Sequence, residues 1–317
     1  LQLPFLARHG IRFWKRSGLW HPAMEKVGVL LLPTIFGAAV YQINILVGTL
    51  LASLLAEGSV AYLYYADRLV QFPLGIFGQA VATAVLPSLS RQAAGGDYAG
   101  LADTFSHAMS LVLFITIPAM VGLIVLREPI VALLFQRGAF GEQATRLTSM
   151  ALLYYVLGLW AFSSVRIVVS VFYALKDTRT PVMTATVSIA TNLVLGMVLM
   201  APLKHGGLAL ATSIASMVNL TLMVCLLRKK MGLIRWRPVL VSCLKTIAAS
   251  IIMAVVVLLI CRLPVFRQSL PGGVRLPIMI VIAIGSGVAV FSVAAKYLAI
   301  SQWDQVMGLV KRSLSRS

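Results

Sequence analysis

The chain has 317 residues, of which 60% are hydrophobic and 11% are charged, and its formal net charge is +18. Soluble domains are about 25% charged, so this composition excludes a soluble enzyme, a disordered tail and a disulfide-stapled secreted module. It predicts an all-α, polytopic transmembrane helix bundle. The basic residues lie in short clusters between apolar runs. This is typical of loops that face anionic lipid headgroups, so we expect membrane lipids and not nucleic acid as partners.

Eight apolar runs are long enough to cross a membrane, because a spanning helix needs about 20 residues. The chain begins at Leu1, and no cleavable signal pattern precedes the first run. We therefore expect it to be the C-terminal part of a longer protein. The spans are expected at about residues 27–56, 59–90, 103–126, 147–174, 182–202, 207–227, 239–261 and 276–300.

Lysines and arginines are divided unequally between the two sides of this arrangement. The richer side holds the basic residues of 1–26, 176–179 and 228–237 and those near the C-terminus. The positive-inside rule places that side, and both ends of the chain, in the cytoplasm. On the opposite side, Ile130–Phe135 is an apolar run too short to span. We expect it to lie at the outer interface as an amphipathic piece.

The second span carries a charge that is costly inside a membrane and that usually faces a cavity or a partner. Helical spacing places Arg68 on a polar stripe with Tyr64, Gln71, Gly75, Gln79 and Thr83. The alternative is an arginine that reaches the outer headgroups and pairs with Asp67. The continuation of the stripe beyond Arg68 favours a cavity. Pro73, Gly75 and Gly78 are expected to act as a hinge.

Arg166 lies deep in the fourth span, with Ser163 and Ser170 at helical spacing and no acid nearby in sequence. Such an arginine suits an anion such as a phosphate, which a guanidinium group binds in a bidentate manner. A structural arginine that bonds to the carbonyls of a broken helix is an equal alternative. Asn44, Asn192 and Thr212 belong to uncharged polar stripes in other spans. Hydrogen bonds between helices explain most residues of this kind.

Motifs of enzyme chemistry are absent from the sequence, which has no HExxH, GxSxG or Walker A pattern and no acidic metal-binding cluster. We therefore expect no catalytic residue, no metal and no cofactor. The three cysteines are odd in number and lie within or beside apolar runs. They predict neither a disulfide framework nor a zinc site.

Two blocks of residues resemble the MurJ (MviN) family of lipid II flippases, which belongs to the MOP exporter superfamily. They are Tyr64-Tyr65-Ala66-Asp67-Arg68 with its continuation through Gly78, and Asp177-Thr178-Arg179-Thr180-Pro181. The resemblance extends from about residue 10 to the C-terminus. It implies a fourteen-helix protein with two six-helix lobes and two final helices, so the N-terminal lobe would be missing here. The implied divisions are a cytoplasmic or interfacial lead-in at 1–26, a six-helix C-terminal lobe at 27–230, and two further helices with a cytoplasmic tail at 231–317.

The resemblance also implies a function. Lipid II, the undecaprenyl-diphosphate-linked peptidoglycan precursor, would pass from the inner to the outer leaflet of the bacterial cytoplasmic membrane by alternating access. Arg68 matches a cationic cavity residue of the family, and Arg166 falls where members carry a basic residue. Tyr64, Asp67 and Gln71 would line the same substrate cavity. The last two helices would form a groove for the lipid tail.

Sodium is a further point of comparison. Some members of the family bind it in this lobe through acids near positions that are Gly48 and Gly196 here. Asn44, Asn192 and Thr212 remain as candidate ion ligands, so sodium coupling is not expected.

Two other functions are compatible with the sequence. One is export of drugs or of other polysaccharide lipids by a different MOP exporter, although a drug-cation exporter would favour acids over arginines in its cavity. The other is a membrane-embedded enzyme of cell-wall synthesis. Assays of lipid II binding and of glycosyl transfer would separate these alternatives.

Overall fold

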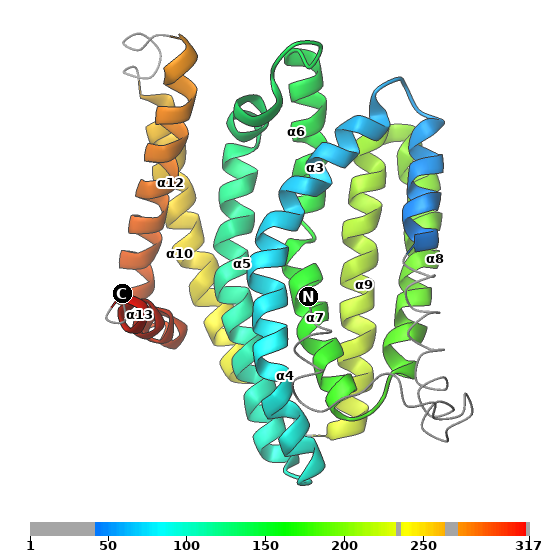
Figure 1. Cartoon of the computed structure of the whole chain (residues 1–317), viewed down its shortest axis with the longest axis vertical. Coiled ribbons are helices and arrows are strands. Elements are labelled where there is room, and N and C mark those ends of the chain that lie inside the picture. The colour runs from blue at the N-terminus through cyan, green and yellow to red at the C-terminus, as the bar shows by residue number, and fades with distance from the viewer. Residues whose placement is uncertain (1–41, 233–235, 264–271, 315–317) are drawn as a thin grey trace, which may run out of the picture.

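The computed structural model of the chain describes residues 42–232, 236–263 and 272–314, and every regular element within them is a helix (Figure 1). The expected lead-in at 1–26 and the first half of the expected first span, 27–41, lie outside the described residues. Of that span, the structure describes the helix Gln42–Ser53. The remaining elements are α3 (Ser59–Pro73), the π-helix η1 (Leu74–Gly78), α4 (Gln79–Ala94), α5 (Tyr98–Phe135), α6 (Glu142–Val156), α7 (Leu159–Ala174), α8 (Arg179–Leu203), α9 (His205–Met231), α10 (Trp236–Arg262), α12 (Gly272–Tyr297) and α13 (Ser301–Leu314).

Six of the described helical segments are long and apolar enough to cross a membrane, and the pair α6 and α7 makes a seventh when taken as one bent span. These seven coincide with the second to the eighth expected spans. The prediction of an all-α transmembrane bundle is therefore confirmed. The helices α3, η1 and α4 together form one span, Ser59–Ala94.

The fourth expected span is not straight, because α6 and α7 meet at an angle of 41°. At the break, the Gly158 amide donates to the Tyr155 carbonyl instead of the Tyr154 carbonyl that a regular helix would use. The Ser213 hydroxyl of α9 donates to the Tyr154 carbonyl at 2.7 Å and so replaces the missing bond. A side chain on residue 158 would come within 2.8 Å of the Ser213 backbone, so only glycine fits there.

The run Ile130–Phe135 was expected in the connection after the third span, and its place at the outer interface stays a prediction. It is the end of α5, a helix of 38 residues that continues through Pro118 and Pro129. At about 1.5 Å per residue, α5 is about 57 Å long and exceeds the hydrocarbon core of about 30 Å. Val131 is fully buried in the cluster that joins α3 and α6, and Ile130 packs against the cluster that joins α10 and α12. This packing on both sides keeps the run helical.

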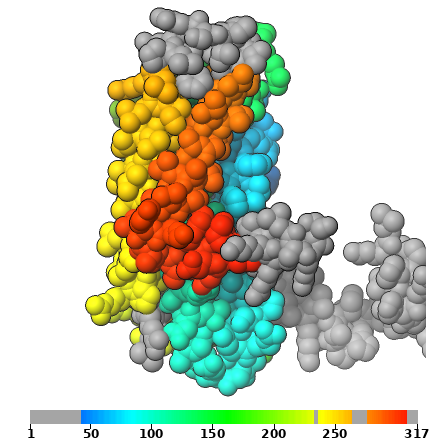
Figure 2. All heavy atoms as spheres, turned by 90° about the vertical axis from the view of Figure 1, so that its left-hand side faces the viewer, coloured from blue at the N-terminus to red at the C-terminus, as the bar shows by residue number. Residues whose placement is uncertain are grey.

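The core consists of three apolar clusters that are arranged around α5. One joins α4, α5, α7 and α9, and a second joins α3, α6 and α9. The third joins α5 to α10 and α12, which lie together on one side of the bundle, while α8 lies at the opposite side (Figure 1). Figure 2 shows α10 and α12 covering that side of the molecule, with α13 crossing near the lower end of α12. A buried hydrogen bond of 2.8 Å from Ser242 of α10 to Gln302 holds α13 in place.

Candidate functional site

The polar stripe expected on the second span lies on the face of α3, η1 and α4 that the rest of the described chain leaves uncovered. Tyr64, Arg68, Gly75, Gln79 and Thr83 are exposed, and Gln71 is half-buried. The opposite face is apolar and packs into the lobe through buried residues that include Leu63, Ala66, Val70, Pro73, Ala82 and Leu89. The polar side chains of the span therefore point away from the apolar core of the lobe.

Arg68 belongs to a local network on α3. Its Nη1 donates to Gln71 Oε1 at 3.3 Å, and Gln71 Nε2 donates to Asp67 Oδ2. The guanidinium carbon lies 4.7 Å from the ring centroid of Tyr64, within the range of a cation–π interaction. Gln71 therefore connects the arginine with the aspartate through its two ends. The network orients Arg68 while its charge remains on the exposed face.

The expected hinge residues coincide with a change of helix type. Pro73 ends α3, and the five residues Leu74–Gly78 that follow form η1, in which the Gln79 amide donates to the Leu74 carbonyl. Single π-turns within α-helices occur frequently at functional sites. Gly78 is buried, and a Cβ there would lie 3.5 Å from Ser163 Oγ and 3.6 Å from Arg166 Cδ. A Cβ at Gly78 would thus make ordinary van der Waals contact with α7, whereas Gly75 has open space around it.

Arg166 is half-buried on α7 and reaches across to the polar stripe, where its Nη1 donates to Gln79 Oε1. The Ser170 hydroxyl donates to the Arg166 carbonyl at 3.0 Å. The Ser163 hydroxyl, one turn earlier, is fully buried and has no hydrogen-bond partner among the described residues. Arg166 therefore contacts the same face as Arg68. Its contact residue, Gln79, lies eleven positions further along the span, or about 16 Å at 1.5 Å per residue.

The three candidate ion ligands form a chain of hydrogen bonds between helices. Asn192 Nδ2 of α8 donates to Asn44 Oδ1 at 2.8 Å, and Thr212 Oγ1 of α9 lies 3.2 Å from Asn192 Oδ1. Hard cations take several oxygen ligands, usually with carboxylates among them. These three groups are neutral and bond to one another, and no carboxylate is among them. A Cβ on Gly196 would also lie within 3.4 Å of Leu208 and Leu51, which leaves little room for an acid.

Metal-binding clusters were not expected from the sequence. The part of the chain that the structure describes contains no group of three or more His, Cys, Asp or Glu side chains that could hold a metal ion.

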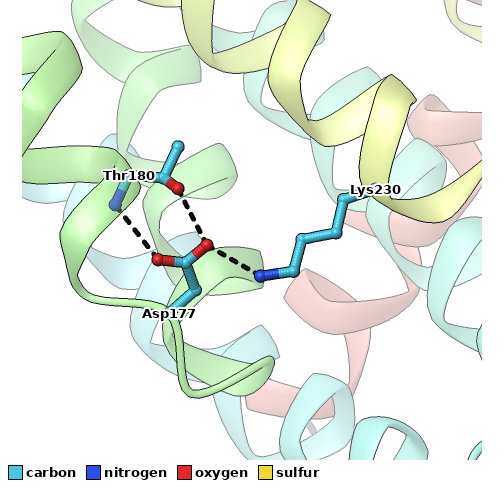
Figure 3. A network of polar contacts seen from close by, with 3 residues as sticks. All are labelled: Asp177, Thr180 and Lys230. Atoms are coloured by element: carbon cyan, nitrogen blue, oxygen red, sulfur yellow. Dashed lines mark hydrogen bonds and ion pairs between the residues drawn. The ribbon is translucent and has the colours of Figure 1, made fainter.

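Asp177 has a role that the residues alone did not reveal (Figure 3). Its Oδ1 accepts from the Thr180 amide at 3.0 Å, and its Oδ2 accepts from the Thr180 hydroxyl at 2.8 Å and from Lys230 Nζ at 2.7 Å. Burial of the carboxyl group raises its pKa, but the hydrogen bonds from Lys230 and Thr180 outweigh burial and lower the pKa to about 2. The carboxylate thus caps the first turn of α8 and connects it to the end of α9. Its position three residues before Thr180 is the spacing of a helix N-cap, which is the signal that could have identified it.

Comparison with known proteins establishes the family. Residues 1–268 match the family model described as Lipid II flippase MurJ. The chain belongs to the MurJ family. The probable lipid II flippase MurJ of Vibrio cholerae serotype O1 is 39% identical over 222 residues, which cover 70% of this chain and 42% of the relative. That of Rhizobium meliloti is 38% identical over 245 residues, which cover 77% and 46%. The chain thus spans less than half the length of these MurJ relatives.

Solved structures agree with this assignment. The lipid II flippase MurJ in an inward closed conformation is similar with a TM-score of 0.71 and 28% identity, over 94% of this chain and 60% of that one. An outward-facing MATE family transporter of the MOP superfamily is similar with a TM-score of 0.56 and 15% identity, over 86% and 65%. The second likeness shows a common fold alone. A MurJ-family chain with several apolar helices is a multi-pass protein of the bacterial inner membrane.

Proposed function

We propose that this chain forms the C-terminal lobe, at 27–230, and the two final helices, at 231–317, of a lipid II flippase. The whole protein would move lipid II from the inner to the outer leaflet by alternating access, without covalent chemistry and without a resident cofactor. Membership of the MurJ family supports this proposal. The names of the MurJ relatives also support it, because each is described as a probable lipid II flippase.

The observation that carries the proposal is the position of Arg68 on a polar face that the rest of the described chain leaves uncovered, in an otherwise apolar span. A diphosphate cannot cross hydrocarbon unless its charge is compensated, since an unpaired buried charge costs several kcal/mol or more, about 20 in the idealised limit. A guanidinium group offers a planar pair of donors that matches phosphate oxygens. The polar face continues from Arg68 to Gln79 and Thr83, so it supplies a hydrated path for the headgroup and not a single contact.

The polyprenyl tail of the substrate needs an apolar surface that the headgroup path does not provide. The helices α10 and α12, which cover the side of the molecule shown in Figure 2, expose many large apolar side chains. These residues suit contact with acyl or polyprenyl chains. They include Leu244, Ile251, Leu258, Val281, Val288 and Val293.

We assign the cytoplasmic side to the end of the bundle that holds Arg91, Arg179 and Lys230. The bond between Asp177 and Lys230 supports this orientation, because it places the α7–α8 connection and the end of α9 together at that end. The concentration of exposed basic residues there suits anionic lipid headgroups. Both ends of this chain would then face the cytoplasm.

Sodium has no role in this proposal, because Asn44, Asn192 and Thr212 already bond to one another. We expect the rate of lipid II transport by the full-length protein in vesicles to stay the same when potassium replaces sodium. A rate that falls severalfold without sodium would contradict this part of the proposal.

A test of the function uses the full-length protein in a bacterium that is depleted of its own lipid II flippase. Arg68→Ala should abolish growth rescue. Arg137→Ala, which removes an exposed arginine from the α5–α6 connection, should rescue fully. Immunoblots of the membrane fraction verify that the two variants are present at equal levels. Full rescue by Arg68→Ala at the wild-type level would overturn the proposal.

A further inference from the structure

The connection between α12 and α13 fixes the direction of α13. Ala299 adopts a positive φ of 48° in this turn, and its carbonyl accepts from Lys245 Nζ of α10 at 3.3 Å. The buried bond from Ser242 to Gln302 holds the first turn of α13 to the same helix. As a result, α13 runs across the bundle at the foot of α12 instead of continuing along it (Figure 1).

The first two turns of α13 are amphipathic. Trp303 and Val306 pack against the apolar cluster that joins α5, α10 and α12, whereas Asp304 and Gln305 are exposed. Apolar and polar residues therefore lie on opposite sides of these turns. Amphipathic helices that also carry Lys or Arg lie in the plane of a membrane interface.

The length of α12 sets the level of α13 relative to the membrane. The apolar part of α12, Leu276–Tyr297, has 22 residues, or about 33 Å at 1.5 Å per residue, which matches the hydrocarbon core of about 30 Å. Tyr297 ends α12 and is 87% exposed, and tyrosine is enriched at membrane interfaces. Because α13 begins four residues later, it lies at the level of the headgroups. Figure 2 shows α4 and the start of α5 beyond that level.

Basic residues gather where α10, α12 and α13 meet. Lys296 of α12 is exposed, and Lys245 of α10 reaches the turn between α12 and α13. Lys311 and Arg312 belong to the last turn of α13, and Asp304 is the only acid in that helix. The four basic residues outnumber this acid, so the region carries a net positive charge. Such a charge at headgroup level is complementary to the anionic lipids of the cytoplasmic leaflet.

We propose that α13 lies in the plane of the inner membrane interface and, together with Lys245 and Lys296, binds the headgroups of anionic phospholipids. Because α13 is bonded to α10 and joined to α12, this surface anchors the two final helices in the inner leaflet. The inference uses the orientation assigned above and does not depend on transport of lipid II.

The test identifies the lipids that surround Trp303 in the full-length protein. The protein is reconstituted in phosphatidylcholine vesicles that contain brominated phosphatidylglycerol or, in a parallel series, brominated phosphatidylcholine. Bromine quenches tryptophan fluorescence at short range, and the difference between the wild type and Trp303→Phe isolates the signal of Trp303. The lipid preference is the ratio of the brominated fractions of the two lipids that quench half of this signal.

The wild type should prefer phosphatidylglycerol at least about fivefold, because one basic residue near an anionic surface contributes about that factor. Replacing Lys311 and Arg312 together by glutamine should lower the preference at least about fivefold. Lys296→Gln removes one charge of the same region and should lower it about two- to fivefold. Thermal unfolding of each variant verifies that the protein is folded.

The matched control replaces Arg137 and Arg146 by glutamine. It removes the same charge from two exposed residues at the other end of the bundle, and it should leave the lipid preference unchanged. An equal loss in this control would mean that the charge of the whole protein attracts the lipid, and it would overturn the assignment to α13. A Trp303 signal that neither lipid quenches would place α13 away from the membrane and overturn the proposal. Equal quenching by both lipids in the wild type would overturn it as well.

Discussion

The carboxylate of Asp177 offers a graded test of how the α7–α8 connection is held to α9. Three substitutions remove different parts of the arrangement in Figure 3. Lys230→Met removes the ion pair alone. Asp177→Asn removes the charge but keeps an oxygen that can accept from the Thr180 amide. Asp177→Ala removes the ion pair and both bonds to Thr180.

The expected magnitudes follow from the exposure and the number of the lost contacts. The Lys230 side chain is 44% exposed, so solvent screens the ion pair and we expect a loss of about 0.2–1 kcal/mol in Lys230→Met. Loss of an N-cap costs about 0.5–2 kcal/mol. Asp177→Ala should therefore lower the free energy of unfolding by about 1–3 kcal/mol, with Asp177→Asn between the two. For a protein of this size or larger, each kcal/mol shifts the unfolding temperature by roughly 2–4 °C.

The effect of pH has a defined sign, because the folded protein lowers the pKa of Asp177 from 3.8 to about 2. A depressed carboxyl pKa contributes stability that is fully present above 3.8 and is lost as the pH falls through about 2. The difference in stability between the wild type and Asp177→Asn should therefore be constant near neutral pH and shrink below about pH 4.

Differential scanning fluorimetry of the detergent-solubilised full-length protein measures both effects. The result that would refute the reasoning is an unchanged unfolding temperature in all three variants at pH 7. A difference between the wild type and Asp177→Asn that grows on acidification would refute the pH argument separately.

Two further predictions concern helix packing. Gly158→Ala should lower the free energy of unfolding by about 1–3 kcal/mol, because the new Cβ would come within 2.8 Å of the Ser213 backbone. The control is Gly122→Ala, where a Cβ meets nothing within 4 Å, and it should raise the free energy of unfolding by up to about 1 kcal/mol. Equal unfolding temperatures of the two variants would contradict the proposed steric cause. Ser242→Ala removes the hydroxyl that donates to the buried Gln302 side chain and should cost about 1–3 kcal/mol. Limited proteolysis should then cleave near α13 sooner than in Ser301→Ala, and identical cleavage rates would argue against the role of this hydrogen bond.

The positions of the spans could be predicted from the sequence because the thickness of the hydrocarbon core sets the length of an apolar run. The local network around Arg68 could also be predicted from the sequence, since Tyr64, Asp67 and Gln71 lie three or four residues from a partner on one helix. The residue at which α5 ends could not be predicted from the sequence. Hydropathy measures whether a run can span a membrane, but Ile130–Phe135 remains helical because of its packing against other helices.

The contacts that join distant segments could not be predicted from local sequence patterns. Gln79 and Arg166 are 87 residues apart, and Asp177 and Lys230 are 53 residues apart. Neither pair has a spacing that periodicity could reveal. The break at Gly158 depends in the same way on Ser213, which supplies a hydrogen bond from another helix. Tertiary packing decides these features, and the residues that surround each position in sequence do not.

The central claim is that the Arg68 guanidinium binds the diphosphate of a lipid-linked substrate. The most direct measurement is the ratio of the affinities of the full-length protein for undecaprenyl diphosphate and for undecaprenol, which shares the tail and lacks the phosphates. We expect Arg68→Gln to reduce this ratio by at least about tenfold while leaving the affinity for undecaprenol unchanged. An undiminished preference for the diphosphate in Arg68→Gln would contradict the claim.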